Sequence, residues 1–164
     1  MKTLLILRHA KSSWKDPHLA DHDRPLNKRG KLDAPRMGQL LLDEGLLPDL
    51  IISSTAKRAR NTVEGLLEGS GYSPEVQYTR DFYPGYPDTF IDILGALDDK
   101  YEQVMIVGHN PGLEELLEVL TGDYERLPTA ALAQVQLPVH SWADLGEEPQ
   151  GELVAVWRPK ELYL

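Results

Sequence analysis

Short apolar runs alternate with longer segments of helical periodicity along most of this chain, and this alternation constrains its fold more than any other feature. Apolar runs that are typical of buried strands occupy residues 3–7, 50–53 and 104–107. Apolar residues recur at helical spacing in the segments between and after them, at residues 27–42, 56–67, 89–97 and 113–120. This alternation predicts an α/β fold, a three-layer α/β/α arrangement around a mostly parallel central sheet.

Three further segments extend the predicted sheet. Residues 75–78 have the composition of an edge strand, and residues 131–139 and 152–157 are predicted as two more strands near the sheet edge. The polar stretch from Lys11 to Arg24 is predicted as a loop. The 164 residues contain no internal repeat and no low-complexity tract, so we expect residues 1–164 to form a single domain.

Charge and composition argue against several classes of function. The chain has 17 Lys and Arg residues against 26 Asp and Glu residues, a net charge of −9. This balance argues against binding to nucleic acid or to an anionic membrane, but it allows a local basic pocket. The absence of cysteine excludes disulfides, thiolate metal sites and cysteine nucleophiles. The apolar runs are too short to cross a bilayer, and charges at positions 8 and 9 interrupt any signal peptide, so we expect a cytoplasmic protein.

Basic side chains and histidines follow the three clearest predicted strands. Arg8 and His9 come directly after the first strand, Ser54 and Arg58 follow the second, and His109 follows the third. In an open α/β sheet, ligands bind just beyond the carboxyl ends of the strands. We therefore expect two arginines and two histidines to converge on one rim of the sheet.

This combination of side chains favours phosphoryl chemistry. A guanidinium group offers a planar fork of donors that suits phosphate oxygens, and an imidazole can attack phosphorus or donate a hydrogen bond. The sequence predicts metal-independent phosphoryl transfer, with arginines in the place of the usual cation. It also predicts binding of phosphate-like or sulfate-like anions and no cofactor.

Three motifs, in order along the chain, resemble those of the histidine phosphatase (phosphoglycerate mutase-like) superfamily. Residues 7–10, Leu-Arg-His-Ala, resemble its Arg-His-Gly signature, with Ala10 in place of the more usual glycine. Residues 54–62 are similar to its second arginine motif, and residues 107–110, Val-Gly-His-Asn, resemble its second histidine motif. More specifically, residues 8–12 and 23–30 resemble the small SixA-type phosphohistidine phosphatases.

The resemblance implies a phosphoglycerate mutase-like fold and a role for each residue that matches a motif. His9 matches the nucleophile that becomes phosphorylated, and Arg8 and Arg58 match the arginines that hold the phosphoryl oxygens. His109 matches the second pocket histidine, which stabilises the charge of the transferring group. The general acid of the superfamily is usually a glutamate after the third strand, and Asp81 is the nearest carboxylate in the matching stretch of this chain.

The expected activity is hydrolysis of a phosphoryl group, carried by phosphohistidine on a protein, through a phosphohistidine intermediate on His9. An imidazole leaving group already accepts a proton at neutral pH, so it needs less acid assistance than an alkoxide. Two alternatives stay open. One is a phosphatase or mutase that acts on a small phosphorylated metabolite, and the other is a non-catalytic phosphate-binding module.

A cluster of histidines and aspartates in the first loop, and a second arginine near Arg58, each have a functional and a purely structural interpretation. The loop cluster of His18, Asp21, His22 and Asp23 has donors that zinc accepts, but a polar loop explains them equally well, and we expect no metal. Arg60 is expected on a different helix face from the anion-binding arginine, in solvent.

The predicted walls of the site are few. Residues 11–24 and 82–88 are the segments expected to wall it, and the aromatic residues Trp14, Tyr83 and Tyr86 belong either to its rim or to the core and surface. Walls this short predict an open, shallow pocket. Such a pocket favours a phosphorylated side chain on a folded partner over a small sugar phosphate.

Overall fold

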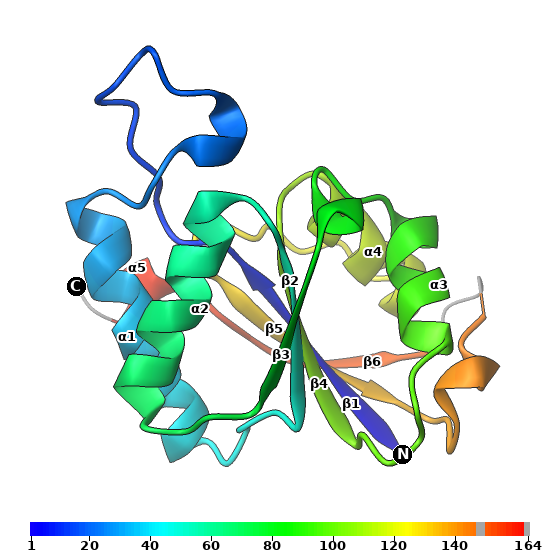
Figure 1. Cartoon of the computed structure of the whole chain (residues 1–164). Helices are drawn as coiled ribbons and strands as arrows, with labels where there is room; N and C mark the ends of the chain where they lie inside the picture. Colours follow the sequence, from blue (N-terminus) through cyan, green and yellow to red (C-terminus); the bar gives the residue numbers. More distant parts are fainter. Residues whose placement is uncertain (147–149, 163–164) are drawn as a thin grey trace.

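A central mixed sheet organises the chain in the computed structural model, which describes residues 1–146 and 150–162 (Figure 1). Within these ranges the sheet has six strands in the order β3-β2-β4-β1-β5-β6. Their bounds are β1 (Lys2–Arg8), β2 (Leu50–Ser54), β3 (Glu75–Thr79), β4 (Gln103–Gly108), β5 (Leu132–Leu137) and β6 (Glu152–Trp157). The pairs β3-β2, β2-β4 and β4-β1 are parallel, whereas β5 is antiparallel to both β1 and β6. The prediction of a mostly parallel sheet is confirmed.

Helices cover both faces of the sheet. Figure 1 shows α1 and α2 on one side and α3 and α4 on the other, which confirms the predicted three layers. The helices are α1 (Lys28–Asp43), α2 (Lys57–Ser70), α3 (Pro87–Gly95), α4 (Gly112–Thr121) and the short α5 (Pro159–Leu162). Single 3-10 turns lie at Asp21–Asp23, Arg80–Phe82 and Trp142–Asp144. The sequence patterns gave no indication of α5.

The two helical layers explain why the strand sequences are apolar at consecutive positions. Leu5 and Leu7 of β1 belong to the core on the α1 and α2 side, whereas Leu4 and Ile6 belong to the core on the α3 and α4 side. Each of these side chains is at most 1% exposed. A strand that is covered on both faces has no solvent-facing position, so the alternation of a half-exposed strand is absent.

Backbone contacts fasten the loop after β1 to the start of α1. Asn27 caps α1, because its side chain accepts a hydrogen bond from the N–H of Gly30. A Cβ atom at Gly30 would lie 2.2 Å from the carbonyl oxygen of Lys11, so only glycine permits this approach. The loop formed by residues 11–24 therefore starts from a rigid base before it extends beyond α1 and α2 (Figure 1).

None of the helices in the described ranges combines the length and the hydropathy that a membrane span requires.

Candidate active site

The carboxyl ends of β1, β2 and β4 bring the four predicted arginine and histidine side chains together. Arg8 ends β1, His9 follows it, Arg58 lies in the first turn of α2 after β2, and His109 follows β4. The ring centroids of His9 and His109 are 5.0 Å apart. A cavity of about 230 Å³, named the central pocket below, is lined by Arg8, His9, Lys11, Ser12, Trp14, Arg24, Arg58, His109, Asn110 and Thr129.

Hydrogen bonding selects one tautomer of His9. Its Nδ1 atom lies 2.7 Å from the carbonyl oxygen of Ala10, and because a carbonyl can only accept, Nδ1 carries the hydrogen. The neutral ring then has its lone pair on Nε2. Ala10 is itself fixed, since its N–H donates to the Thr62 hydroxyl at 2.9 Å, and that hydroxyl donates to the carbonyl of Arg58.

Burial keeps the two histidines of the central pocket neutral. Loss of hydration is the largest cause that lowers the pKa of His9 from 6.5 to about 3. The hydrogen bond to the carbonyl of Ala10 opposes this shift, and the electrostatic effects of His109, Arg58 and Arg8 add to it. Burial likewise lowers the pKa of His109 to about 3, with Arg58 as the next largest cause. The cationic neighbours alone therefore do not account for the neutral imidazole, because desolvation contributes more.

Several buried polar atoms of the central pocket have no hydrogen-bond partner among the described residues. His109 binds Ser54 through Nε2 at 2.8 Å, but its Nδ1 atom is unpartnered. The Nε atoms of Arg8 and Arg58 are unpartnered as well. Buried polar groups in folded proteins are nearly always paired, so these atoms form a set that an oxygen-rich anion can satisfy.

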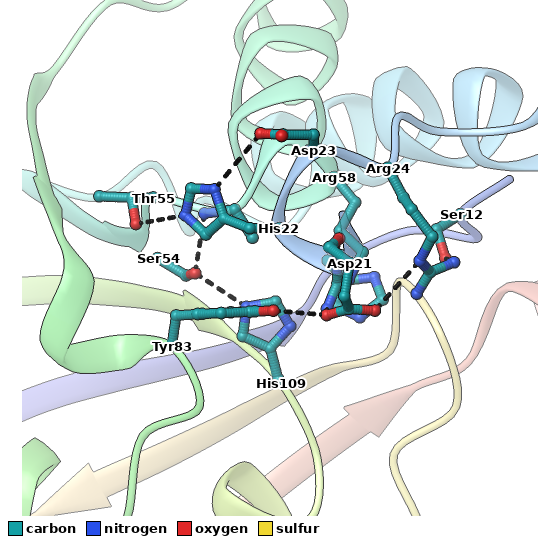
Figure 2. Close-up of polar contacts among 12 residues, drawn as sticks. Ser12, Asp21, His22, Asp23, Arg24, Ser54, Thr55, Arg58, Tyr83 and His109 are labelled. Atoms are coloured by element: carbon teal, nitrogen blue, oxygen red, sulfur yellow. Dashed lines mark hydrogen bonds and ion pairs between the residues drawn. The ribbon is translucent and has the colours of Figure 1, made fainter. Parts of the chain in front are cut away.

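Asp21 belongs to the site, although its sequence context predicts only a polar loop residue. Its Oδ2 atom accepts hydrogen bonds from Arg58 at 3.0 Å and from the Tyr83 hydroxyl at 2.6 Å, and its Oδ1 atom accepts from Arg24 at 3.1 Å (Figure 2). Its main-chain carbonyl accepts a further bond from Arg58 at 2.7 Å. The hydrogen bond from Tyr83, followed by those from the arginines, lowers the pKa of Asp21 to about 2. Asp21 is therefore an anion at neutral pH that orients two arginines.

Arg24 is the third arginine of the central pocket, and it is not among the site residues predicted from the sequence. It is buried, donates to the Ser12 hydroxyl at 2.8 Å, and lies over the ring of Trp14 at 3.5 Å from the centroid. Trp14 is otherwise 73% exposed at the mouth of the pocket. The signal that marks Arg24 is its place in the segment 23–30, which resembles the SixA-type sequences.

The structure does not place Asp81 with the other predicted site residues. Asp81 is exposed in the 3-10 turn Arg80–Phe82, and it is not among the residues that line the central pocket. Tyr83, two positions later, reaches the site through Asp21. Arg60 is exposed, as expected, and lies 4.3 Å from the ring centroid of Tyr78.

The loop cluster that raised the zinc alternative makes other contacts. His22 bonds to the Thr55 hydroxyl at 2.8 Å and lies 3.7 Å from Asp23, and Asp21 is engaged by the arginines (Figure 2). Among the residues that the structure describes, no three histidine or carboxylate side chains are grouped so that they could hold a metal ion. The described side-chain contacts of Asp21, His22 and Asp23 are thus with one another or with neighbouring side chains of the protein.

A larger cavity of about 670 Å³ adjoins the central pocket and is named the side cavity below. Segments 126–129 and 158–161 form much of its wall. Leu132 of β5 pairs with both Leu7 and Trp157, which brings these two segments to the end of β1. The expectation that residues 11–24 and 82–88 alone wall the site is therefore wrong, because the antiparallel strands return two further segments to it.

The comparisons with known proteins agree on one family. The model of the histidine phosphatase superfamily (branch 1) matches residues 4–82, which contain Arg8, His9 and Arg58. An uncharacterized chloroplastic protein of Arabidopsis thaliana is 36% identical over 157 residues, which cover 87% of this chain and 70% of that relative.

Solved structures show the same fold. SixA from Agrobacterium tumefaciens has a TM-score of 0.83 and 29% identity, and the match covers 96% of this chain and 98% of that one. The protein histidine phosphatase SixA complexed with tungstate has a TM-score of 0.84 at 20% identity, covering 98% and 99% of the two chains. These likenesses confirm the predicted phosphoglycerate mutase-like architecture.

Proposed function

This chain belongs to the histidine phosphatase superfamily, and we propose that it hydrolyses phosphohistidine carried by a protein, through a phosphohistidine intermediate on its own His9. We assign the activity to a single domain that spans residues 1–164. The observation that carries the proposal is the state of His9. Its ring is neutral, its Nδ1–H is bound by the carbonyl of Ala10, and its Nε2 lone pair is left for attack.

The proposed first step transfers the phosphoryl group to the enzyme. Nε2 of His9 attacks phosphorus, a new N–P bond forms, and the N–P bond of the substrate breaks in line with it. The leaving imidazole takes up a proton from solvent. Arg8, Arg58 and His109 hold the oxygens of the transferring group, and their fixed donors stabilise its charge without reorganisation.

The second step returns the enzyme to its starting state. Water attacks the phosphorus on His9, the N–P bond to Nε2 breaks, and inorganic phosphate leaves. One hydrogen of the water stays on the phosphate, and the other passes to solvent as a proton, which replaces the proton taken up in the first step. The hydrogen bond from Nδ1 to Ala10 persists in both steps, so the ring does not need to change tautomer. Asp21 supports both steps because it keeps Arg58 aimed at the central pocket.

Phosphohistidine on a protein is favoured by the chemistry of the leaving group and by the access to the site. None of the described residues that line the central pocket is an aspartate or a glutamate. An imidazole leaving group requires less assistance from a general acid than an alkoxide does. The similarity to proteins named SixA supports the same substrate class. The exposed Trp14 at the pocket mouth offers a partner protein an aromatic contact.

Steady-state kinetics on two substrate classes test the substrate assignment. We expect a higher kcat/KM for a phosphohistidine-bearing protein domain than for small sugar phosphates. A strong, saturable preference for one small metabolite would overturn the protein substrate and leave the chemistry of His9 intact. Release of inorganic phosphate at every turnover distinguishes a phosphatase from a mutase. If the wild-type protein binds phosphate but turns over neither substrate class, it is a non-catalytic binding module.

Asp81 stays a prediction as the general acid, and its test uses two leaving groups. If Asp81 donates a proton, Asp81→Asn lowers kcat on phenyl phosphate by about 100-fold and changes phosphohistidine hydrolysis far less, because an imidazole leaving group depends less on an acid of the enzyme for its proton. The control is Asp88→Asn, an exposed carboxylate on α3. Unchanged kcat on both substrates in Asp81→Asn excludes the role.

A further inference from the structure

Positive charge exceeds negative charge on the walls of the side cavity. Its basic lining residues are Arg8, Lys11, Arg29, Arg126, Arg158 and Lys160. Its acidic lining residues are Asp33, Glu114 and Glu161. In a chain with a net charge of −9, this excess is a local property of one surface, next to the central pocket.

Two of the three acidic side chains are already engaged by groups of the wall itself. Asp33 is buried and accepts hydrogen bonds from Nε of Arg29 at 3.1 and 3.2 Å. Glu114 accepts the backbone N–H of Leu127 at 2.7 Å. The first pair lies within α1, and the second bond joins α4 to the segment before β5, so both carboxylates are held by the walls of the cavity.

Some of the basic side chains that line the side cavity have no acidic partner among the described residues. Arg158 pairs with Glu161 at 3.4 Å and with Glu125 at 2.9 Å. By contrast, the side chains of Arg126 and Lys11 make no ion pair or hydrogen bond with any residue that the structure describes, although both line the cavity. The side cavity thus presents at least two cations that can bind an anion without first breaking a contact.

The side cavity and the central pocket share part of their walls. Arg8, Lys11, Asn110 and Thr129 line both. At this boundary the Nε atom of Arg8 and the Oδ1 atom of Asn110 are buried without a hydrogen-bond partner among the described residues. A ligand that spans both cavities therefore meets an unpaired donor and an unpaired acceptor between them. A volume of about 670 Å³ lies within the range of clefts that hold small ligands or side chains.

We propose that the side cavity is a second anion subsite, which binds a carboxylate or phosphate group on the leaving-group side of the substrate while the transferred phosphoryl group occupies the central pocket. The inference rests on the proposed function and deepens it, since it states what the substrate carries besides its phosphoryl group. Arg126 and Lys11 supply the charge, and the rim around Arg8 aligns the two anions of one substrate.

Calorimetric binding of phosphonates tests the subsite without any turnover. The probes are alkylphosphonates and the matching phosphonates with a terminal carboxylate, compared at each of several chain lengths. At the chain length that reaches the subsite, the carboxylated member binds about 10-fold more tightly, because a charge-assisted hydrogen bond is gained. Phosphonates are not hydrolysed, so calorimetry tests the subsite whether or not the chain hydrolyses phosphohistidine. A failure of the proposed function would appear in the kinetic assays instead.

Two substitutions at Arg126 show where the preference arises. Arg126 lines the side cavity and not the central pocket, so Arg126→Gln keeps the affinity for alkylphosphonates and loses the preference for the carboxylate. Arg126→Glu reverses the preference, and Arg60→Gln, a cation elsewhere on the surface, leaves it unchanged. Equal affinities at every chain length, or a preference that persists in Arg126→Glu, overturn the subsite.

Substrate pairs then identify the source of the anion. One pair consists of phosphohistidine peptides that are flanked by Glu or by Gln, and the other of small phosphoramidates with and without a carboxylate. A higher kcat/KM for the Glu-flanked peptide that depends on Arg126 assigns the anion to a protein substrate. The same dependence on Arg126 in the small pair alone assigns it to a small molecule, and dependence in neither pair contradicts a role in substrate binding.

Discussion

The Oδ2 atom of Asp21 lies 3.0 Å from a terminal nitrogen of Arg58, and the main-chain carbonyl of Asp21 accepts a second bond from the same guanidinium. The two residues are 37 positions apart, so the loop after β1 and the first turn of α2 are joined by this contact. The contact places a buried arginine at the central pocket before any anion binds. Preorganisation of this kind reduces the reorganisation that a charged transition state requires.

Substitution of Asp21 tests whether this contact positions Arg58. We predict that Asp21→Asn weakens tungstate binding by about 10-fold, because the charge-assisted bonds to Arg58 and Arg24 are lost. Asp23→Asn, an exposed neighbour whose carboxylate lies 3.7 Å from His22, serves as the control. Tighter tungstate binding in Asp21→Asn contradicts the positioning role, since it means that Asp21 competes with the anion.

Substitution of the two arginines of α2 distinguishes binding of the phosphoryl group from a general effect of surface charge. Arg58 is buried at the central pocket, whereas Arg60 is exposed beside Tyr78. Arg58→Ala is expected to lower kcat/KM by about 100-fold through loss of a fixed donor to the phosphoryl oxygens. Arg60→Ala is expected to change it little. The reverse order, measured with an aryl phosphate, shows that the anion is held by a different arginine.

The buried histidines predict acid sensitivity of the fold. The pKa of His9 and of His109 is about 3 in the folded chain, whereas the unfolded imidazoles keep a pKa of 6.5. Between these values the unfolded chain binds more protons, so the free energy of unfolding falls as pH drops below 6.5. The expected slope is at most about 1.4 kcal/mol per pH unit for each histidine.

This slope is measured by urea unfolding at about pH 5 to 6.5, a range that lies between the folded and the unfolded pKa of the histidines. His9→Gln is expected to reduce it, and His140→Gln, an exposed histidine outside the site, is the control. The carboxylate of Asp21 stabilises the fold above its ordinary pKa of 3.8, and this contribution is lost only as pH falls through about 2. It therefore does not mask the histidine effect. The same slope in His9→Gln and in the wild type contradicts a strongly lowered pKa for His9.

Metal independence stays a prediction that chelation tests. Because the arginines of the central pocket supply the positive charge that a metal supplies elsewhere, we expect hydrolysis to continue at its full rate in the presence of EDTA. Vanadate and tungstate are expected to inhibit competitively under the same conditions. Loss of activity that zinc or magnesium restores contradicts the metal-independent mechanism.

The parts of this molecule that the sequence predicts are those in which local pattern and topology act together. The strands are apolar on both faces, so they are recognisable as runs, and parallel strands deliver the residues that follow them to one edge. Arg8, His9 and His109 lie next to such strands, and Arg58 lies one turn into the following helix. Their convergence could therefore be predicted without tertiary information.

The parts that the sequence does not predict depend on contacts between distant loops. Asp21 lies in a loop without periodicity, and its role arises only because that loop folds back over Arg58. The side cavity depends on the antiparallel strands β5 and β6, whose pairing direction carries no signal in their composition. The family resemblance implied that Asp81 lies at the site, but Asp81 is exposed in the 3-10 turn, and Tyr83, two positions later, is the residue that reaches Asp21.

Trapping of the phosphoenzyme tests the central claim most directly. Wild-type protein, quenched during turnover of a radiolabelled phosphoramidate, is expected to carry acid-labile, base-stable phosphate on the peptide that contains His9. His9→Ala is expected to keep its fold, to carry no label and to show no turnover. Turnover in the wild type without label on His9, or full activity in His9→Ala, contradicts the mechanism.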